Sequence, residues 1–177
     1  MITKIVSFIL FLTFFMSFKM NGNEKSDGDY EIIINQIVDN FAKKIIDQYG
    51  LVWIGSGGRM PNDIEEVSVK FMAHRKGTIK EARELQVKGT ELLLETINSN
   101  KKIRPYLKEY PFKANRAEVS IAFRKNDNSC YTDGSVVYVF QVKNIIRYFS
   151  EDPLSNNRIL LKEEPYEEAL KIVRNAK

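Results

Sequence analysis

The chain has 177 residues and a formal net charge of +4, which comes from 27 basic and 23 acidic side chains. This length is enough for one domain with its own hydrophobic core and excludes two ordinary domains. Hydrophobic residues make up 44 % of the chain, a value typical of globular proteins, and the interleaved charges of both signs exclude a disordered acidic or basic tail.

The first 22 residues have the layout of a secretory signal peptide. Lys4 precedes an apolar run from Ile5 to Phe18, and a polar stretch containing glycine follows it. The run is about 14 residues long and a membrane span needs about 20, so we favour a cleaved signal over an uncleaved anchor. We therefore expect a periplasmic or secreted protein, which touches a membrane only through this segment if the segment is retained.

Export also changes the expected charge of the domain. Removing Lys4 and Lys19 with the signal leaves 25 basic and 23 acidic side chains, a net charge of +2. Nucleic-acid-binding domains carry a much stronger basic footprint, so we expect no nucleic-acid partner.

A polar spacer at 23–29 leads into the folded domain, which we expect to span 30–177. Apolar residues at spacings of three and four predict a first helix that ends at Gly50, where a left-handed helix end falls. "LVWI" then predicts a short strand. Alternating apolar and polar residues in "EEVSVKFMAHR" predict a second strand with one buried face.

The next segment predicts a long helix that crosses the sheet. Thr78 and Glu81 form a capping-box pattern, and an apolar stripe behind them continues to about Ser99. Gly89 lies on that stripe, which indicates a close approach between the helix backbone and a sheet.

The last third predicts strands and a final helix. "AEVSIAF" and "VVYVFQVKNIIRYF" predict two long strands joined by the turn "KNDNSCYTDGS", and "RILL" predicts an edge strand. Pro165 begins a last helix, and four glutamates lie near its positive end: Glu163, Glu164, Glu167 and Glu168. This order predicts an α+β two-layer sandwich, with helices packed on one face of a mostly antiparallel sheet.

The glycine-rich stretch that follows "LVWI" is the most site-like segment of the sequence. No helix is predicted after its glycines, although a P-loop and a dinucleotide fingerprint both require one, so we predict no cofactor. Ile54 occupies the position where a hydrolase nucleophile elbow needs glycine. We interpret the stretch as a hinge loop; the alternative is a small-anion site formed by Ser56, Gly57, Gly58 and Arg59.

Cys130 and His74 are the single cysteine and the single histidine of the chain. One cysteine cannot form an internal disulfide, and one cysteine with one histidine is too few for a Cys/His zinc site. The two residues are the one pair from which a thiolate nucleophile with a histidine base could be built. A coincidental placement is favoured, because Cys130 lies in a predicted hairpin turn. The same turn holds four oxygen ligands without the order of a calcium loop, so we predict no metal there: Asp127, Asn128, Asp133 and Ser135.

Aromatic and basic residues alternate in "KKIRPYLKEYPFK". Such a segment can form a protein interface or stack single-stranded bases, although aromatic side chains that cap the edge of the core are the favoured interpretation. If the segment is functional, we expect a protein interface. Its candidate binding residues are Arg104, Tyr106, Tyr110 and Phe112, and we expect Phe112 to be buried and Tyr106 to be exposed beside Arg104.

Three segments carry a resemblance to a protein group. "IRPYLKEYPF", "AEVSIAF" and "YTDGSVVYVFQVKN" resemble a group of uncharacterised exported proteins from chlamydia-like intracellular bacteria, over roughly Trp53 to Asp152. The resemblance implies export but no known activity, so it assigns a role to no residue.

We therefore expect a small exported, non-enzymatic domain that binds an unknown protein partner. The alternative is a hydrolase or transferase with a site around Ser56, Arg59, His74 and Cys130.

We predict that the chain is exported and that its mature form begins between about Ser17 and Ser26, because its apolar run is too short for a stable span. Intact-mass measurement on the envelope and secreted fractions tests this. A full-length species that retains Met1 and requires membrane extraction would show instead that the segment is an anchor.

Overall fold

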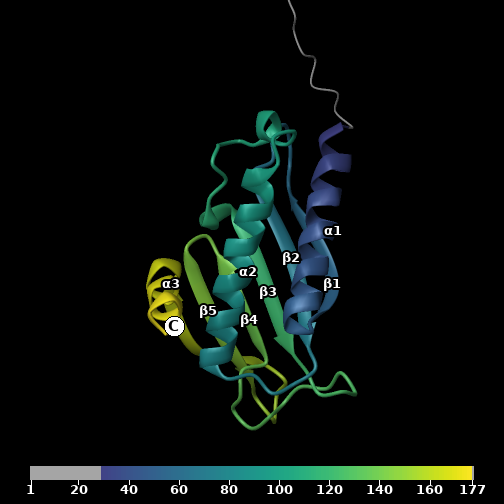
Figure 1. Cartoon of the computed structure of the whole chain (residues 1–177). Helices are drawn as coiled ribbons and strands as arrows, with labels where there is room; N and C mark the ends of the chain where they lie inside the picture. The colour runs from purple at the N-terminus through teal and green to yellow at the C-terminus, as the bar shows by residue number, and fades with distance from the viewer. Residues whose placement is uncertain (1–28, 177) are drawn as a thin grey trace, which may run out of the picture.

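The structure is a computed structural model that describes residues 29–176, so the predicted signal peptide lies outside the described residues. Three helices cover one face of a sheet (Figure 1): α1 (Asp29–Tyr49), α2 (Ile79–Ser99) and α3 (Tyr166–Asn175). Within the described residues, none of the helices is long and apolar enough to cross a membrane.

The sheet has six strands whose spatial order follows their order in the chain. They are β1 (Val52–Arg59), β2 (Glu66–Ala73), β3 (Ala117–Phe123), β4 (Tyr138–Val142), β5 (Ile145–Glu151) and β6 (Arg158–Pro165). β2 and β3 are parallel, and all other neighbours are antiparallel. Because parallel neighbours need a crossover connection, α2 passes over the sheet between β2 and β3. The predicted α+β two-layer sandwich is confirmed.

The helix signals in the sequence act where they were expected. α1 ends at Gly50, which has φ +62° and donates its N–H to the carbonyl of Ile46 at 2.9 Å. At the start of α2 the Thr78 hydroxyl accepts the N–H of Glu81 at 3.2 Å. At Gly89 an added Cβ would lie 3.2 Å from Cγ1 of Val119 on β3, so the glycine allows α2 to approach the sheet closely.

The core lies between the helices and the sheet face that they cover. Alternate residues of β2 and β3 point into it, as the sequence pattern predicted, and those of β2 are Val67, Val69, Phe71 and Ala73. Phe41 on α1 is fully buried and packs edge-to-face on Phe71, with ring centroids 5.8 Å apart. The core is therefore built from every layer of the domain.

The interpretation of the glycine-rich stretch as a hinge loop is wrong. β1 continues through the glycines to Arg59, and Ser56 pairs with Val69 on β2. At Gly58 an added Cβ would lie 2.3 Å from the carbonyl oxygen of Glu66 at the start of β2. The backbones of β1 and β2 are so close here that this position tolerates only glycine.

Two boundaries in the last third also differ from the expectation. The segment predicted as one strand after "DGS" forms β4 and β5, which turn at Lys143 and Asn144; Lys143 has φ +56°. Glu163 and Glu164 belong to β6 rather than to the start of α3, where Pro165 is the residue that precedes the helix. Pro165 does not stop the strand, because its missing N–H costs nothing at a strand end.

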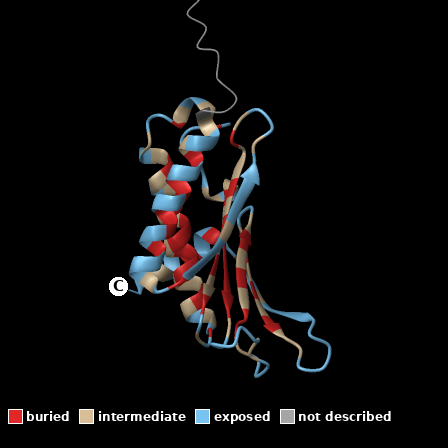
Figure 2. Cartoon of the chain, turned by 90° about the vertical axis from the view of Figure 1, so that its right-hand side faces the viewer, coloured by how far each residue is buried: buried red, intermediate tan, exposed pale blue. Residues whose placement is uncertain are grey.

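Within residues 29–176, the helices all lie on one face of the sheet, and the outer edges of β1 and β6 have no strand paired to them. Figure 2 shows the helices on one side of the sheet and the exposed strand β1 along the edge that faces the viewer. Both edge strands carry exposed apolar side chains: Val52, Trp53 and Ile54 on β1, and Ile159, Leu160 and Leu161 on β6. Apolar side chains left on a free edge indicate a surface that can be covered by a partner.

Phe41→Ala is expected to lower the free energy of unfolding by about 3 to 5 kcal/mol, because it removes a buried ring and leaves a cavity beside Phe71. Ile32→Ala is the matched control on the same helix, since Ile32 is 61 % exposed; we expect a change within about 0.5 kcal/mol. Urea unfolding of both variants measures this. Equal losses would contradict the packing of α1 described above.

Candidate functional site

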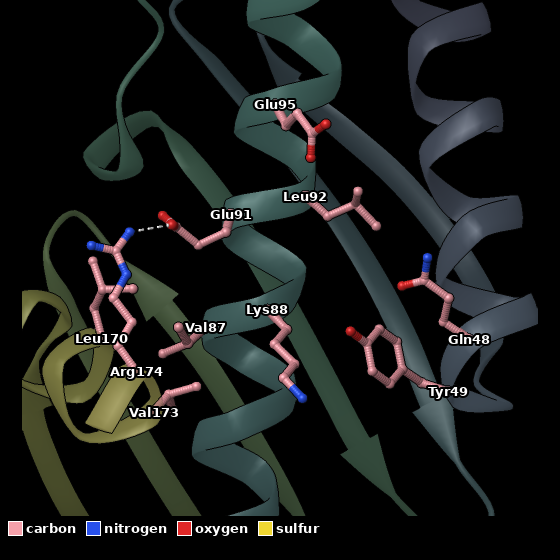
Figure 3. Close-up of a pocket in the computed structure, with 10 residues that line it drawn as sticks. All are labelled: Gln48, Tyr49, Val87, Lys88, Glu91, Leu92, Glu95, Leu170, Val173 and Arg174. Carbon is pink, nitrogen blue, oxygen red and sulfur yellow. Dashed lines mark hydrogen bonds and ion pairs between the residues drawn. The ribbon is translucent and has the colours of Figure 1, made fainter. Parts of the chain in front are cut away.

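A groove of about 420 Å³ runs along α2, between α1 and α3 (Figure 3). Val87, Leu92 and Leu170 provide its apolar surface, and Tyr49 of α1 and Arg174 of α3 stand on opposite sides. The lining also contains polar and charged side chains, and these groups decide whether the groove can take a ligand.

Three of the charged groups in the groove already have bonding partners: Lys88, Glu91 and Arg174. The carboxylate of Glu91 accepts a hydrogen bond from the Tyr166 hydroxyl at 2.7 Å and one from Arg174 at 2.8 Å, which holds α3 against α2. Lys88 is paired with Glu84 at 2.5 Å, and its ammonium lies 6.0 Å from the centre of the Tyr49 ring. The bonds to Glu91 thus fix α3 on α2, and a ligand at this carboxylate would have to replace them.

A second candidate is the buried carboxylate of Glu164 on β6. Its side chain is only 4 % exposed, and Arg83 of α2 donates two hydrogen bonds to it at 2.7 and 3.1 Å. The Tyr148 hydroxyl donates a third at 2.5 Å, and Lys162 lies 2.9 Å from the other oxygen. Burial alone would raise the pKa of Glu164, but the bonds from Arg83, Tyr148 and Lys162 outweigh it and lower the pKa below its ordinary value.

Perturbed buried carboxylates often mark functional sites, but both oxygens of Glu164 are already occupied by partners within the domain. The network joins β5 and β6 to α2. Its role is therefore to hold the end of the sheet under the helix layer. The sequence placed Glu164 at a helix start, so this ion pair was missed.

A row of buried amides and a hydroxyl also escaped the sequence analysis. Gln86 on α2 donates to the carbonyl of Val119 at 2.9 Å, and Gln141 on β4 donates to the carbonyl of Ala114 at 2.6 Å. Thr90 lies between them, with contacts of 3.5 and 3.4 Å to the two glutamines. These groups satisfy strand and loop carbonyls beneath α2. The signal that could have found them is a glutamine and a threonine on the apolar stripe of a helix.

The helix-free side of the sheet carries an aromatic cluster. The rings of Tyr138 and Phe140 on β4 have centroids 5.4 Å apart, and Phe140 stacks on Phe149 of β5 at 5.5 Å with only 2° between the planes. The guanidinium of Arg158 on β6 lies 4.3 Å from the centre of the Tyr138 ring. We call these four residues the aromatic face. All three rings are partly exposed, and none of the helices described within residues 29–176 covers them.

The candidate binding residues of the segment before β3 divide into two groups. Phe112 is 2 % exposed and Tyr110 is 51 % exposed, with the guanidinium of Arg104 lying 4.5 Å from the Tyr110 ring centre. The expected burial of Phe112 is confirmed. The expected exposure of Tyr106 is wrong: its ring packs on Tyr30 of α1, with centroids 5.8 Å apart, and contacts the core.

The physical reason is a short backbone pairing between this segment and the connection that follows β1. The N–H of Ile64 donates to the carbonyl of Tyr106 at 2.7 Å, and the N–H of Lys108 donates to the carbonyl of Ile64 at 3.1 Å. This pairing orients Tyr106 toward α1. Two cations of the segment form ion pairs: Lys108 binds Glu65 at 2.5 Å, and Lys113 binds Glu109 at 2.7 Å.

The residues of the alternative enzymatic site lie on separate elements. Ser56 is opposite Val69, five residues before His74 along β2, so roughly 16 Å separates the two positions. The His74 ring contacts the carbonyl of Lys125 at 3.1 Å. Within the described part of the chain, no hydrogen bond joins His74 to Cys130.

Two further observations bear on the chemistry of these residues. Burial and a hydrogen bond with Glu151 raise the pKa of the Cys130 thiol, whereas a nucleophilic cysteine needs a lowered one. Arg59, a member of the alternative anion site, is already bound to Glu65 at 2.8 Å.

The oxygen ligands of the turn before β4 are used within the turn. Asp127 accepts two hydrogen bonds from Ser129, and Asp133 accepts two from Ser135 and also binds Lys76 at 2.7 Å. Among residues 29–176, no three His, Cys, Asp or Glu side chains come together as a metal site requires.

Comparison of the chain with protein-family models, curated proteins and solved structures finds no match. The resemblance to exported proteins of chlamydia-like bacteria therefore stays a prediction.

We predict that Glu164→Gln costs about 3 kcal/mol of stability at pH 7, because it leaves the largely buried Arg83 without its charged partner. The folded-state pKa of Glu164 is lowered, so its contribution is present above the unfolded value of about 4.3 and is lost as the pH falls below it. The difference between wild type and variant should shrink from pH 7 to pH 3.5.

Glu163→Gln is the matched control, since the neighbouring Glu163 forms an exposed pair with Arg147 at 3.1 Å. It should cost less than about 1 kcal/mol at either pH. Urea unfolding at the two pH values measures both variants. A Glu164→Gln deficit that is the same at pH 7 and pH 3.5 would contradict the ionised state of this carboxylate.

Proposed function

We propose that the protein is an exported domain that binds a protein partner through the aromatic face. The observation that carries this proposal is the cluster of the Tyr138, Phe140 and Phe149 rings on the side of the sheet that none of the three described helices covers. Rigid aromatic side chains are enriched at the centres of protein interfaces, where they bury a large area at a low cost in conformational entropy.

The geometry of the rings favours protein over nucleic acid. A base needs the free face of a ring for stacking, but Phe140 and Phe149 already face each other and Arg158 occupies a position over Tyr138. The rings are partly exposed, and this exposed aromatic surface suits apolar and aromatic side chains of a protein. Arg147, which lies on the same side of the sheet, is paired with Glu163 and adds no free cation.

The alternative function as a hydrolase or transferase has weaker support. Ser56 and His74 are roughly 16 Å apart along β1 and β2, and Arg59 is bound to Glu65. Nucleophilic catalysis requires a nucleophile and a base within hydrogen-bond distance. These residues therefore provide no site at which a substrate would meet both groups.

Export supports a binding role in the envelope or outside the cell, and it rests on the apolar run from Ile5 to Phe18. The partner is accordingly expected among exported, envelope or extracellular proteins.

We predict that Phe140→Ala abolishes capture of the partner, because Phe140 contacts both other rings and its loss dismantles the stack. A central aromatic hot spot contributes about 2 kcal/mol or more to a complex, whereas the half-exposed cross-strand contacts contribute about 1 kcal/mol to folding. The full-length chain is expressed in its source cells, purified by affinity and compared with wild type for co-purifying proteins and melting temperature.

Tyr110→Ala is the matched control, since Tyr110 is an exposed aromatic residue with its own cation–π contact to Arg104. It should leave capture unchanged. If Tyr110→Ala loses the partner and Phe140→Ala keeps it, the segment before β3 is the interface and the aromatic face is not.

A further inference from the structure

The free edge of β1 lacks two of the features that normally prevent strand pairing, charged side chains along the strand and proline, and has a bulge only at Ile54. Exposed edge strands are usually protected by charged side chains or proline. β6, at the opposite edge, has Arg158, Lys162 and Glu163. β1 has no charged side chain before its last residue, Arg59, and no proline.

The order of side chains along β1 is asymmetric. Large apolar residues come first, as Val52, Trp53 and Ile54, and all three are exposed. Small residues follow, as Gly55, Ser56, Gly57 and Gly58. If two copies of β1 pair in an antiparallel direction, the large half of each strand lies beside the small half of the other. A parallel pair would instead place large residues beside large ones and glycine beside glycine.

The register of β1 against β2 shows which residues share a face. Trp53 pairs with Phe71 and Gly58 with Val67, so both lie on the helix side of the sheet, because Phe71 and Val67 point into the core. Simple alternation would place residues 53 and 58 on opposite faces. The register shift between Trp53 and Gly55 makes Ile54 an extra residue and brings the two onto one face.

Because of this register shift, opposed residues of two symmetrically paired β1 strands lie on the same face of the sheet along the whole ladder. With Ser56 of each copy at the two-fold axis, Gly55 lies opposite Gly57 and Trp53 lies opposite Gly58 of the second copy. Each opposed pair then lies on a common face, as antiparallel pairing requires. Trp53 would pack over Gly58 beside the side chain of Met60, whose Cε lies 2.8 Å from the position of an added Cβ there. An aromatic side chain packed over a glycine is a recognised way to stabilise that glycine in a sheet.

We propose that β1 is a homodimer interface, in which two copies pair antiparallel about Ser56 and join their six-stranded sheets into one. The symmetry is of the self-complementary kind that most dimers have. Charge does not oppose it: the two Arg59 residues lie at opposite ends of the ladder, and each remains beside its own Glu65. Both aromatic faces end on the same side of the joined sheet, so the dimer offers its partner two of them.

The test places charges at the two-fold axis. Ser56→Lys and Ser56→Glu each oppose two like charges across the ladder, which destabilises pairing, whereas an equimolar mixture opposes unlike charges. The protein is purified from cells without truncation. Its molar mass in solution is then measured by light scattering coupled to size-exclusion chromatography, over a hundredfold range of protein concentration. Wild type should be dimeric, each variant alone should need at least tenfold more protein to dimerise, and the mixture should regain the wild-type behaviour.

Two controls keep the outcome specific. Both Ser56 variants should keep the far-UV spectrum of wild type and a cooperative melt, since Ser56 is exposed, and their melting temperatures should fall only by the amount that dimerisation adds to wild type. Ile159→Lys places a charge on the opposite edge, β6, and should leave the dimer intact. A wild-type chain that is monomeric throughout the range, dimers that ignore the Ser56 charges, or a mixture that stays monomeric would each overturn the proposal.

Discussion

The close contact between α2 and β3 determines how the rest of the domain is arranged. β2 and β3 are parallel, so the chain between them has to cross the sheet, and α2 lies flat because Gly89 lets its backbone rest on Val119. Gln86 adds a hydrogen bond from the helix to the Val119 carbonyl at 2.9 Å. Once α2 is fixed there, α1 packs on one of its sides and α3 on the other, where the Tyr166–Glu91 bond and the Arg83–Glu164 pair hold the C-terminal elements.

All three described helices lie on one side of the sheet, so the side chains on the other side can pack only on one another. Phe140 and Phe149 do this by stacking, and Arg158 covers Tyr138. Such lateral packing holds the rings rigid while they stay partly exposed. A surface that is ordered before a partner arrives loses little entropy on binding, which is the physical link between this sheet face and the proposed function.

Predictions held where a local signal was sufficient and failed where distant contacts decide. Gly50 and Thr78 mark helix ends through bonds within one turn, and the alternation in β2 and β3 is independent of their neighbours. The turn at Lys143 was missed because lysine is not a residue that favours positive φ. Tyr106 was misplaced because its orientation depends on pairing with Ile64, far away in the sequence. Glu164 was assigned to α3 because its partners Arg83 and Tyr148 are visible only in the folded chain.

The glycines of β1 show why composition alone could not locate this surface. Glycine permits a loop, but it equally permits a close approach of two backbones, and at Gly58 the carbonyl of Glu66 leaves no room for a side chain. Glycine inside a strand weakens it, because it loses more conformational entropy on ordering and offers nothing to pack. On β1 that weakness lies at an open edge, next to exposed Val52 and Trp53. The large apolar side chains of the first half have no neighbour to pack on, and the glycines of the second half have no side chain to pack. Antiparallel pairing with a second copy places the large side chains of each strand over the glycines of the other.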